Sequence, residues 1–160
     1  FTSRIIFYTL YTYAALVPFI LSSKLILGAR LYTDLVVWRD YFAVLFLVAL
    51  FIVSYVFCVL TFIRSMRSIE HMWAFGVEPV LWLSGMWAPL YAIAKSNVPG
   101  IAWVTRYNPF GYATDALRQI FFHDARFAPL TLSCAVMAAA TVFFLILSYW
   151  LLKRRLRVVG

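Results

Sequence analysis

Glu78 is the most unusual candidate for chemistry in this sequence, because it lies in an otherwise uncharged apolar run, Met72–Ala94. A carboxylate inside a lipid bilayer is costly, so an acid in such a run is by default a functional candidate. One interpretation is that Glu78 lies on a transport pathway or serves as an ion or proton site. An interfacial structural role stays open, since the helical rise places Glu78 only about 10 Å from Glu70 and His71.

Aromatic side chains form the second group of candidates. Rings supply apolar faces and hydroxyls supply hydrogen bonds, so aromatic residues can line a route for a sugar or an amphipathic lipid. The candidates for such a substrate pathway are Tyr8, Tyr11, Trp82 and Trp87. Ordinary packing, or a belt at the membrane–water interface, would explain the same residues without any substrate.

The third candidate is the stretch Asn108–Asp124, which is predicted to form a short amphipathic helix. Asn108 can cap its first free amides, and Pro109 suits the first helical position because its missing N–H would be unpaired there. Asp115 and Arg118 stand three positions apart on the polar side, where an ion pair on a solvated face contributes about 0.2–0.5 kcal/mol. The apolar stripe comprises Phe110, Ala113, Leu117, Ile120 and Phe121.

Motifs for nucleotide, metal or nucleophilic chemistry are missing from the sequence. The six glycines are scattered, and none belongs to a loop that could cradle a phosphate. His71 and His123 are isolated, and Cys58 and Cys134 lie inside apolar runs, which excludes a metal pair or a disulfide framework. We therefore expect a protein that is not an enzyme and that holds no cofactor or metal.

The composition indicates a membrane protein. Hydrophobic residues make up 65% of the 160 residues, and the mean hydropathy is +0.90, both above the range of a soluble globule. The net charge of +8 could suggest nucleic acid. The basic residues are spread among apolar runs instead of forming a basic face, however, so they fit the loops of a membrane protein better.

The elements that would position these residues are four apolar runs, each long enough to cross a bilayer. They are Ile5–Ser23, Tyr41–Ile63, Met72–Ala94 and Phe127–Leu152. Pro18 is expected to kink the first run, and the third is expected to be broken. Gly28–Asp40 is predicted as a polar connection and Lys95–Tyr107 as a loop, with Pro99-Gly100 as its turn.

The predicted fold is all-α, an integral membrane protein with four transmembrane helices plus a short re-entrant or interfacial helix before the last one. About fourteen helical residues reach only about 20 Å, so the short helix cannot cross a hydrocarbon core of about 30 Å. Residues 1–160 are expected to form a single transmembrane domain. Four crossings place both ends on one side, and the basic tail Lys153–Arg157 predicts that this side is cytoplasmic.

Two pieces of the sequence together resemble the permease subunits of ABC-2 type exporters. The first is Ser84–Leu90, SGMWAPL, which fits the pattern SG-x-x-x-P-L. An aromatic residue, Trp103, follows in the connecting segment, and then comes Asn108–Arg118, NPFGYATDALR. The order and spacing of these pieces, one final apolar run and a basic tail match the family over roughly residues 41–157.

The resemblance implies a six-helix permease of which this chain holds the last four helices. It implies a bacterial inner-membrane location, a second permease copy and a cytoplasmic ATP-binding partner, which Arg64, Arg67 and Glu70 would contact. It also implies that Asn108, Pro109, Tyr112, Asp115 and Arg118 belong to a gate on the outer side, with Asp115 and Arg118 as its latch.

Three functions remain open from the sequence. The first is ATP-driven export of a lipid-linked glycan or a hydrophobic compound by a permease whose ATP is hydrolysed by its partner. The second is a secondary carrier that uses Glu78 as its ion or proton site, since such carriers combine broken helices with buried acids. The third is a membrane scaffold that transports nothing. Membrane lipids are expected partners in every case, and nucleic acid is not.

Overall fold

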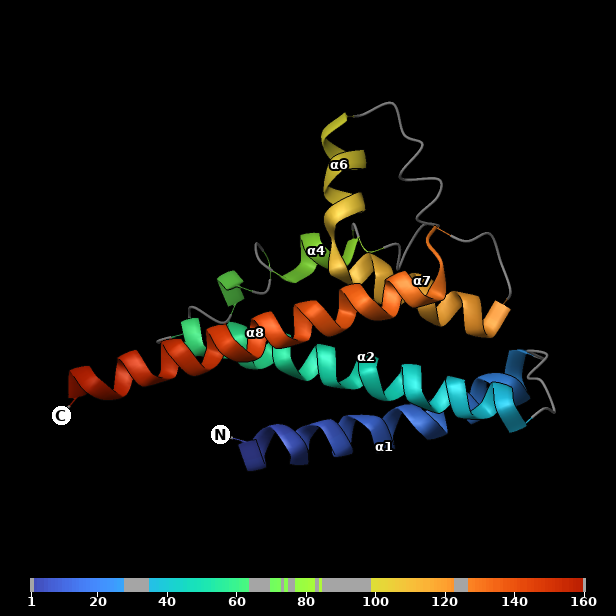
Figure 1. Ribbon diagram of the computed structural model, residues 1–160, viewed down its shortest axis with the longest axis horizontal. Coiled ribbons are helices and arrows are strands. Elements are labelled where there is room, and N and C mark those ends of the chain that lie inside the picture. Colours follow the sequence, from blue (N-terminus) through green and yellow to red (C-terminus); the bar gives the residue numbers. More distant parts are fainter. Residues whose placement is uncertain are drawn as a thin grey trace.

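The computed structural model describes residues 2–27, 35–63, 70–72, 74, 77–82, 84, 99–122 and 127–159, and the regular structure in these residues is entirely helical. Figure 1 shows the arrangement of the elements. Their bounds are α1 Thr2–Leu27, α2 Leu35–Phe62, α4 Glu78–Trp82, α6 Pro99–Tyr107, α7 Pro109–Phe122 and α8 Leu130–Val159.

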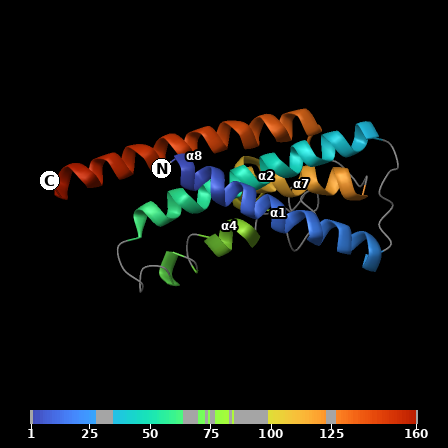
Figure 2. The ribbon, with the colours of Figure 1, turned by 90° about the horizontal axis from the view of Figure 1, so that it is seen from below.

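The three long helices α1, α2 and α8 form the body of the molecule. Helix α2 packs against α1 and, more extensively, against α8, and α7 lies beside α8. Helix α1 crosses α2 obliquely when the molecule is seen from below (Figure 2). The N-terminus and the C-terminus lie at the same end of the molecule, while α6 stands across the direction of the long helices (Figure 1).

Two of the helices are long and apolar enough to cross a membrane within the described part of the chain. Their apolar segments are Tyr41–Phe62 of α2 and Leu130–Arg155 of α8. These two segments match the second and fourth predicted runs. Helix α1 covers the first predicted run and continues through Pro18. Of the third run, α4 is the described helix, and it has only five residues.

Small polar residues are buried in α2 and α8, which pack against each other. Ser54, Thr141 and Ser148 are buried. Their hydroxyls donate to the carbonyl oxygen four residues earlier in the same helix, at 2.7, 2.8 and 2.6 Å. A polar side chain that bonds its own helix leaves no unmet group in an apolar interface. Small size and internal bonding together explain why these hydroxyls are tolerated there.

Two segments that were predicted as non-helical connections are partly helical in the structure. Helix α2 begins at Leu35, so the polar connection predicted over Gly28–Asp40 is partly helical. The predicted loop Lys95–Tyr107 contains the nine-residue helix α6, which begins at Pro99. The Pro-Gly pair was interpreted as a turn. Proline is also favoured at the first position of a helix, where its fixed φ is suitable and its missing N–H costs nothing.

Candidate functional site

Helix α7 carries the candidate site, and Asn108 fixes where it begins. The side-chain oxygen of Asn108 accepts a hydrogen bond from the Phe110 N–H at 3.1 Å, which confirms the predicted cap, and Pro109 is the first helical residue. The Asn108 amide also donates to the Val80 carbonyl of α4, at 2.9 Å. The buried Asn108 therefore joins α7 to a segment 28 residues earlier in the chain.

Tyr112 joins α7 to α6 and to the start of α8. Its hydroxyl donates to the Arg106 carbonyl at 2.9 Å. This carbonyl lies in the last turn of α6, where main-chain oxygens have no partner within the helix. The ring of Tyr112 packs edge-on against the ring of Phe127, with centroids 5.6 Å apart. Phe127 precedes α8 by three residues, so one side chain contacts two neighbouring segments.

Asp115 holds the connection between α7 and α8. Its carboxylate accepts hydrogen bonds from the Phe127 and Ala128 N–H groups, each at 3.1 Å. The Gln119 amide donates to the same carboxylate and to the Ala128 carbonyl, both at 2.7 Å. Asp115 is only 3% exposed, so the predicted solvated position is wrong. N–H groups near the start of a helix favour a negatively charged partner. The N–H groups of Phe127 and Ala128, just before α8, lie against α7 and find this partner in Asp115.

Phe110 places the first turn of α7 beside the middle of α2. Its ring centroid lies 4.7 Å from those of Phe51 and Tyr55, which are central in the apolar segment Tyr41–Phe62. Phe144 of α8 completes this aromatic cluster, 5.3 Å from Tyr55. Further along α7, Leu117 and Ile120 pack against Tyr41 and Leu45, at the start of the same segment. Helix α7 therefore runs beside half the length of α2.

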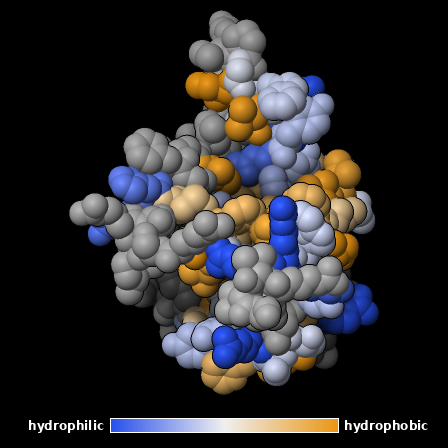
Figure 3. Space-filling view, turned by 90° about the vertical axis from the view of Figure 1, so that its left-hand side faces the viewer, coloured by the Kyte–Doolittle hydropathy of each residue, from blue (hydrophilic) through white to orange (hydrophobic). Residues whose placement is uncertain are grey.

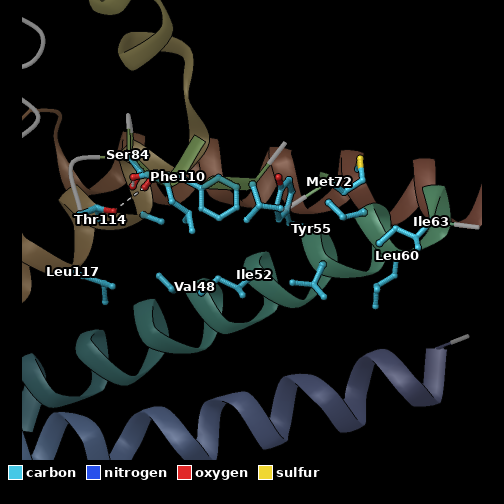
Figure 4. Close-up of a pocket in the computed structure, with 15 residues that line it drawn as sticks. Val48, Ile52, Tyr55, Leu60, Ile63, Met72, Ser84, Phe110, Thr114 and Leu117 are labelled. Carbon is cyan, nitrogen blue, oxygen red and sulfur yellow. Dashed lines mark hydrogen bonds between the residues drawn. The ribbon is translucent and has the colours of Figure 1, made fainter. Parts of the chain in front are cut away.

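A cavity of about 550 Å³ lies between α2, α7 and the segment that contains α4. Its size is within the range of about 300–1,000 Å³ that is usual for small-ligand sites. The wall is almost entirely apolar, and Figure 4 shows its side chains between the helices. The lining residues with hydroxyls are Tyr55, Ser84 and Thr114.

The comparisons with known proteins identify the family. The family model of the ABC-2 type transporter matches residues 1–122. The chain belongs to the ABC-2 type transporter family. The match includes α1, which lies outside the region of the sequence resemblance, and ends at the last residue of α7. No curated protein and no solved structure matches the chain.

Membership makes the chain an ABC transporter permease located in a membrane, and it implies an ATP-binding partner in general. The two apolar helices agree with the membrane location. No group of three or more His, Cys, Asp or Glu side chains that could hold a metal ion occurs within the described ranges of the permease. Cys58 and Cys134 are free thiols.

The predicted pathway residues lie apart from the cavity where they are described. Tyr8 and Tyr11 are 48% and 67% exposed on α1, and the Tyr8 ring lies 5.8 Å from that of Phe57. Glu78, also exposed, is the first residue of α4. Trp82 ends α4, but its side chain and the whole of Trp87 lie outside the described residues. Their pathway role stays a prediction.

Of the predicted partner-contact residues, Glu70 is described, and it belongs to the end of the permease where the termini lie. Glu70 is exposed there, whereas Arg64 and Arg67 lie outside the described residues. Exposed basic residues at this end are Arg4, Lys153 and Arg154. Figure 3 looks onto this end and shows hydrophilic side chains among hydrophobic ones. The Arg154 guanidinium lies over the Trp150 ring at 5.5 Å, a cation–π contact near the end of the apolar segment.

Proposed function

We propose that this chain is the membrane-spanning part of an ATP-driven exporter. A partner subunit hydrolyses the ATP, and the permease moves a lipid-linked glycan or a hydrophobic compound outward. Family membership supports this assignment, as does the absence of a nucleotide-binding motif from the sequence. In this proposal the permease is not itself an enzyme, and two copies pair around the route.

The proposed topology has four crossings and a re-entrant α7 in the bacterial inner membrane. Helices α1, α2 and α8 and the segment containing α4 cross the bilayer. Helix α7 enters from the outer side as far as Phe110, beside the middle of α2. The exposed basic residues near both termini support a cytoplasmic position for that end, because cytoplasmic segments of membrane proteins are rich in Lys and Arg.

The observation that carries the proposal is that α7 is attached to each of its neighbours by a different side chain. Asn108 bonds α4, Tyr112 bonds α6, and Asp115 bonds the residues before α8. The Phe110 ring contacts α2. A short helix held in this way must move when its neighbours tilt. We therefore assign α7 as the outer gate, which opens when ATP-driven closure of the partner subunits tilts the crossing helices.

The test removes one attachment of the gate and leaves the aromatic packing in place. Tyr112→Phe deletes the bond to the Arg106 carbonyl but keeps the ring on Phe127. The matched control is Tyr107→Phe, since Tyr107 is 65% exposed and its ring contacts Trp103. We expect export by the complex to change by about two- to tenfold in Tyr112→Phe, the range for one hydrogen bond of about 0.5–1.5 kcal/mol. The control should export normally.

Partner ATPase activity and membrane expression are measured in the same samples. Tyr112→Phe is expected to keep both while export changes, because the variant alters the gate and not the partner contact. Unchanged export by both Tyr112→Phe and the more disruptive Pro109→Gly, at normal expression, would remove α7 from the gating role.

A further inference from the structure

We propose that the cavity between α2 and α7 is a binding site for one aliphatic chain, and that this chain is the apolar part of the exported molecule. The presence of a binding site for an aliphatic chain follows from the cavity alone. Its assignment to the exported molecule rests on the proposed function, and names the chemical class of substrate that the permease takes.

The lining of the cavity extends along α2. One face of α2 forms its floor, with Val48, Ile52, Val59 and Ile63 in succession at helical spacing. Figure 4 shows Val48, Ile52 and Ile63 in this order along the helix. The fifteen helical steps from Val48 to Ile63 span about 22 Å at a rise of 1.5 Å per residue. A cavity of about 550 Å³ with a lining of this length can accommodate an extended hydrocarbon chain.

The opposite wall is apolar as well. Helix α7 contributes Phe110, Ala113 and Leu117, and the segment around α4 contributes Val77 and Leu81. None of the described residues that line this cavity is Asp, Glu, Lys, Arg or His. A charged group in the ligand would therefore meet no counter-charge within the cavity, and the wall instead offers continuous dispersion contact.

Two of the three described hydroxyls in the wall already donate inside the protein, which argues against a sugar. Ser84 donates to the Leu81 carbonyl, and Thr114 donates to the Phe110 carbonyl at 3.0 Å. Both donors are thus already used inside the protein. A glycan in this cavity would leave most of its hydroxyls without partners, which is costly in an apolar site. The cavity therefore suits the lipid part of a lipid-linked molecule and not its glycan.

Access to the cavity is from the side of the helix bundle. Val56 and Leu60 line the cavity and are also 44% and 51% exposed on the surface of α2. A chain could enter there from the surrounding bilayer. The wall near Ile63 and Met72 belongs to the end with the termini, and the wall formed by Phe110 and Leu117 belongs to α7. An occupant that fills the cavity would therefore contact the proposed gate directly.

The experiment uses the permease in complex with its ATP-binding partner, reconstituted in phosphatidylcholine vesicles. Two photoreactive probes are compared: phosphatidylcholine with a diazirine in one acyl chain, and trace hexadecyl phosphate with a diazirine in its chain. Peptide mass spectrometry locates the adducts. We expect hexadecyl adducts at lining residues such as Ile52 and Val59, and we expect them to decrease when the partner hydrolyses ATP.

Variants that fill the cavity test the location. Val59→Phe is expected to lower labelling of the lining about fivefold or more, because the larger side chain occupies part of the space that the aliphatic chain would fill. Leu60→Trp is a second blocking variant, placed where half of the side chain is already exposed and the larger ring can be accommodated. The matched control is Val142→Phe on α8, which is 55% exposed and does not line the cavity. It should label as the unchanged protein does.

The outcomes separate the site, its occupant and the proposed function. If only the phosphatidylcholine probe forms adducts, and their amount does not change with ATP hydrolysis, the bound chain comes from a bilayer lipid. This result would overturn the assignment to the exported molecule. No adduct on the lining from either probe would overturn the site. Neither result affects the Tyr112→Phe export measurement, so the gate can stand while this inference fails.

Discussion

At the scale of single residues, the cap was predictable and the other attachments of α7 were not. Asn108 and Pro109 act on amides within three positions of themselves, so local chemistry predicted where α7 begins. The second bond of Asn108, to Val80, depends on a segment 28 residues away. The chemistry of Asn108 indicated that a second bond would exist. The cap uses the oxygen of its side-chain amide, so the NH₂ group needs an acceptor elsewhere.

Asp115 shows the limit of pattern reasoning at this scale. Its place off the apolar stripe predicted exposure, yet it is buried under the chain that leads into α8. Asp115 is buried because Phe127 and Ala128, beyond the end of α7, lie against it. The spacing of residues within α7 does not predict this contact. The Asp115–Gln119 pair at i,i+4 was a usable signal, since such pairs form hydrogen bonds on helix surfaces.

Replacing Asp115 by Asn should loosen the α7–α8 connection. The amide keeps the size of the carboxylate but offers one acceptor oxygen in place of two, so at least one main-chain N–H loses its partner. We expect a loss of about 1–3 kcal/mol in local stability. Hydrogen exchange at the Phe127 and Ala128 amides of the complex should speed up about tenfold or more. Ser148→Ala, which removes a hydrogen bond inside α8, should leave those amides unchanged.

At the scale of elements, uncharged length predicted two helices that are long and apolar enough to cross a membrane, while crossings by the first and third runs stay predictions. The segments Tyr41–Phe62 and Leu130–Arg155 lie within a few residues of the predicted runs, because a bilayer demands about 20 apolar residues. Helix α6 was missed, since Pro99-Gly100 fits both a turn and a helix start. The sequence predicted a re-entrant or interfacial position for α7, and the ring contact of Phe110 with Phe51, beside the middle of α2, supports the re-entrant one.

The two ends of α8 test the proposed topology. Thr131 and Lys153 are both exposed, near opposite ends of that helix. In a background with Cys58→Ala and Cys134→Ala, we expect Thr131→Cys to react with a membrane-impermeant maleimide added to cells whose outer membrane has been opened. Lys153→Cys should react only after the inner membrane is also opened. The reverse pattern would place α7 on the cytoplasmic side and overturn the outer gate.

At the scale of the whole molecule, the exposed surface shows what the permease needs around it. Large apolar side chains are exposed along α1 and α8, including Phe7, Tyr11, Phe143 and Ile146. Lipid or a neighbouring subunit must cover them, because soluble monomers rarely expose such extended patches. The sequence predicted this from composition alone, but it could not show which face of each helix is left uncovered.

Glu78 distinguishes the exporter from the secondary carrier. Because its side chain is exposed and does not line the cavity, we expect Glu78→Gln to change ATP-driven export less than twofold. Transport is measured in vesicles with the partner and ATP, and again with the permease alone under a proton gradient. The secondary carrier would be supported over the exporter if the permease alone transports under a proton gradient, and if Glu78→Gln abolishes this transport while Glu70→Gln does not.

The bonds of Asp115 also bear on how the protein is made. During synthesis α7 leaves the ribosome before residues 127 and 128, and until then Gln119 is the only one of the carboxylate's partners described here that has been translated. A carboxylate with so few partners is costly to bring into lipid. We therefore expect the newly made α7 to wait in the water outside and to enter the bilayer together with α8, so that insertion of the last helix completes the gate.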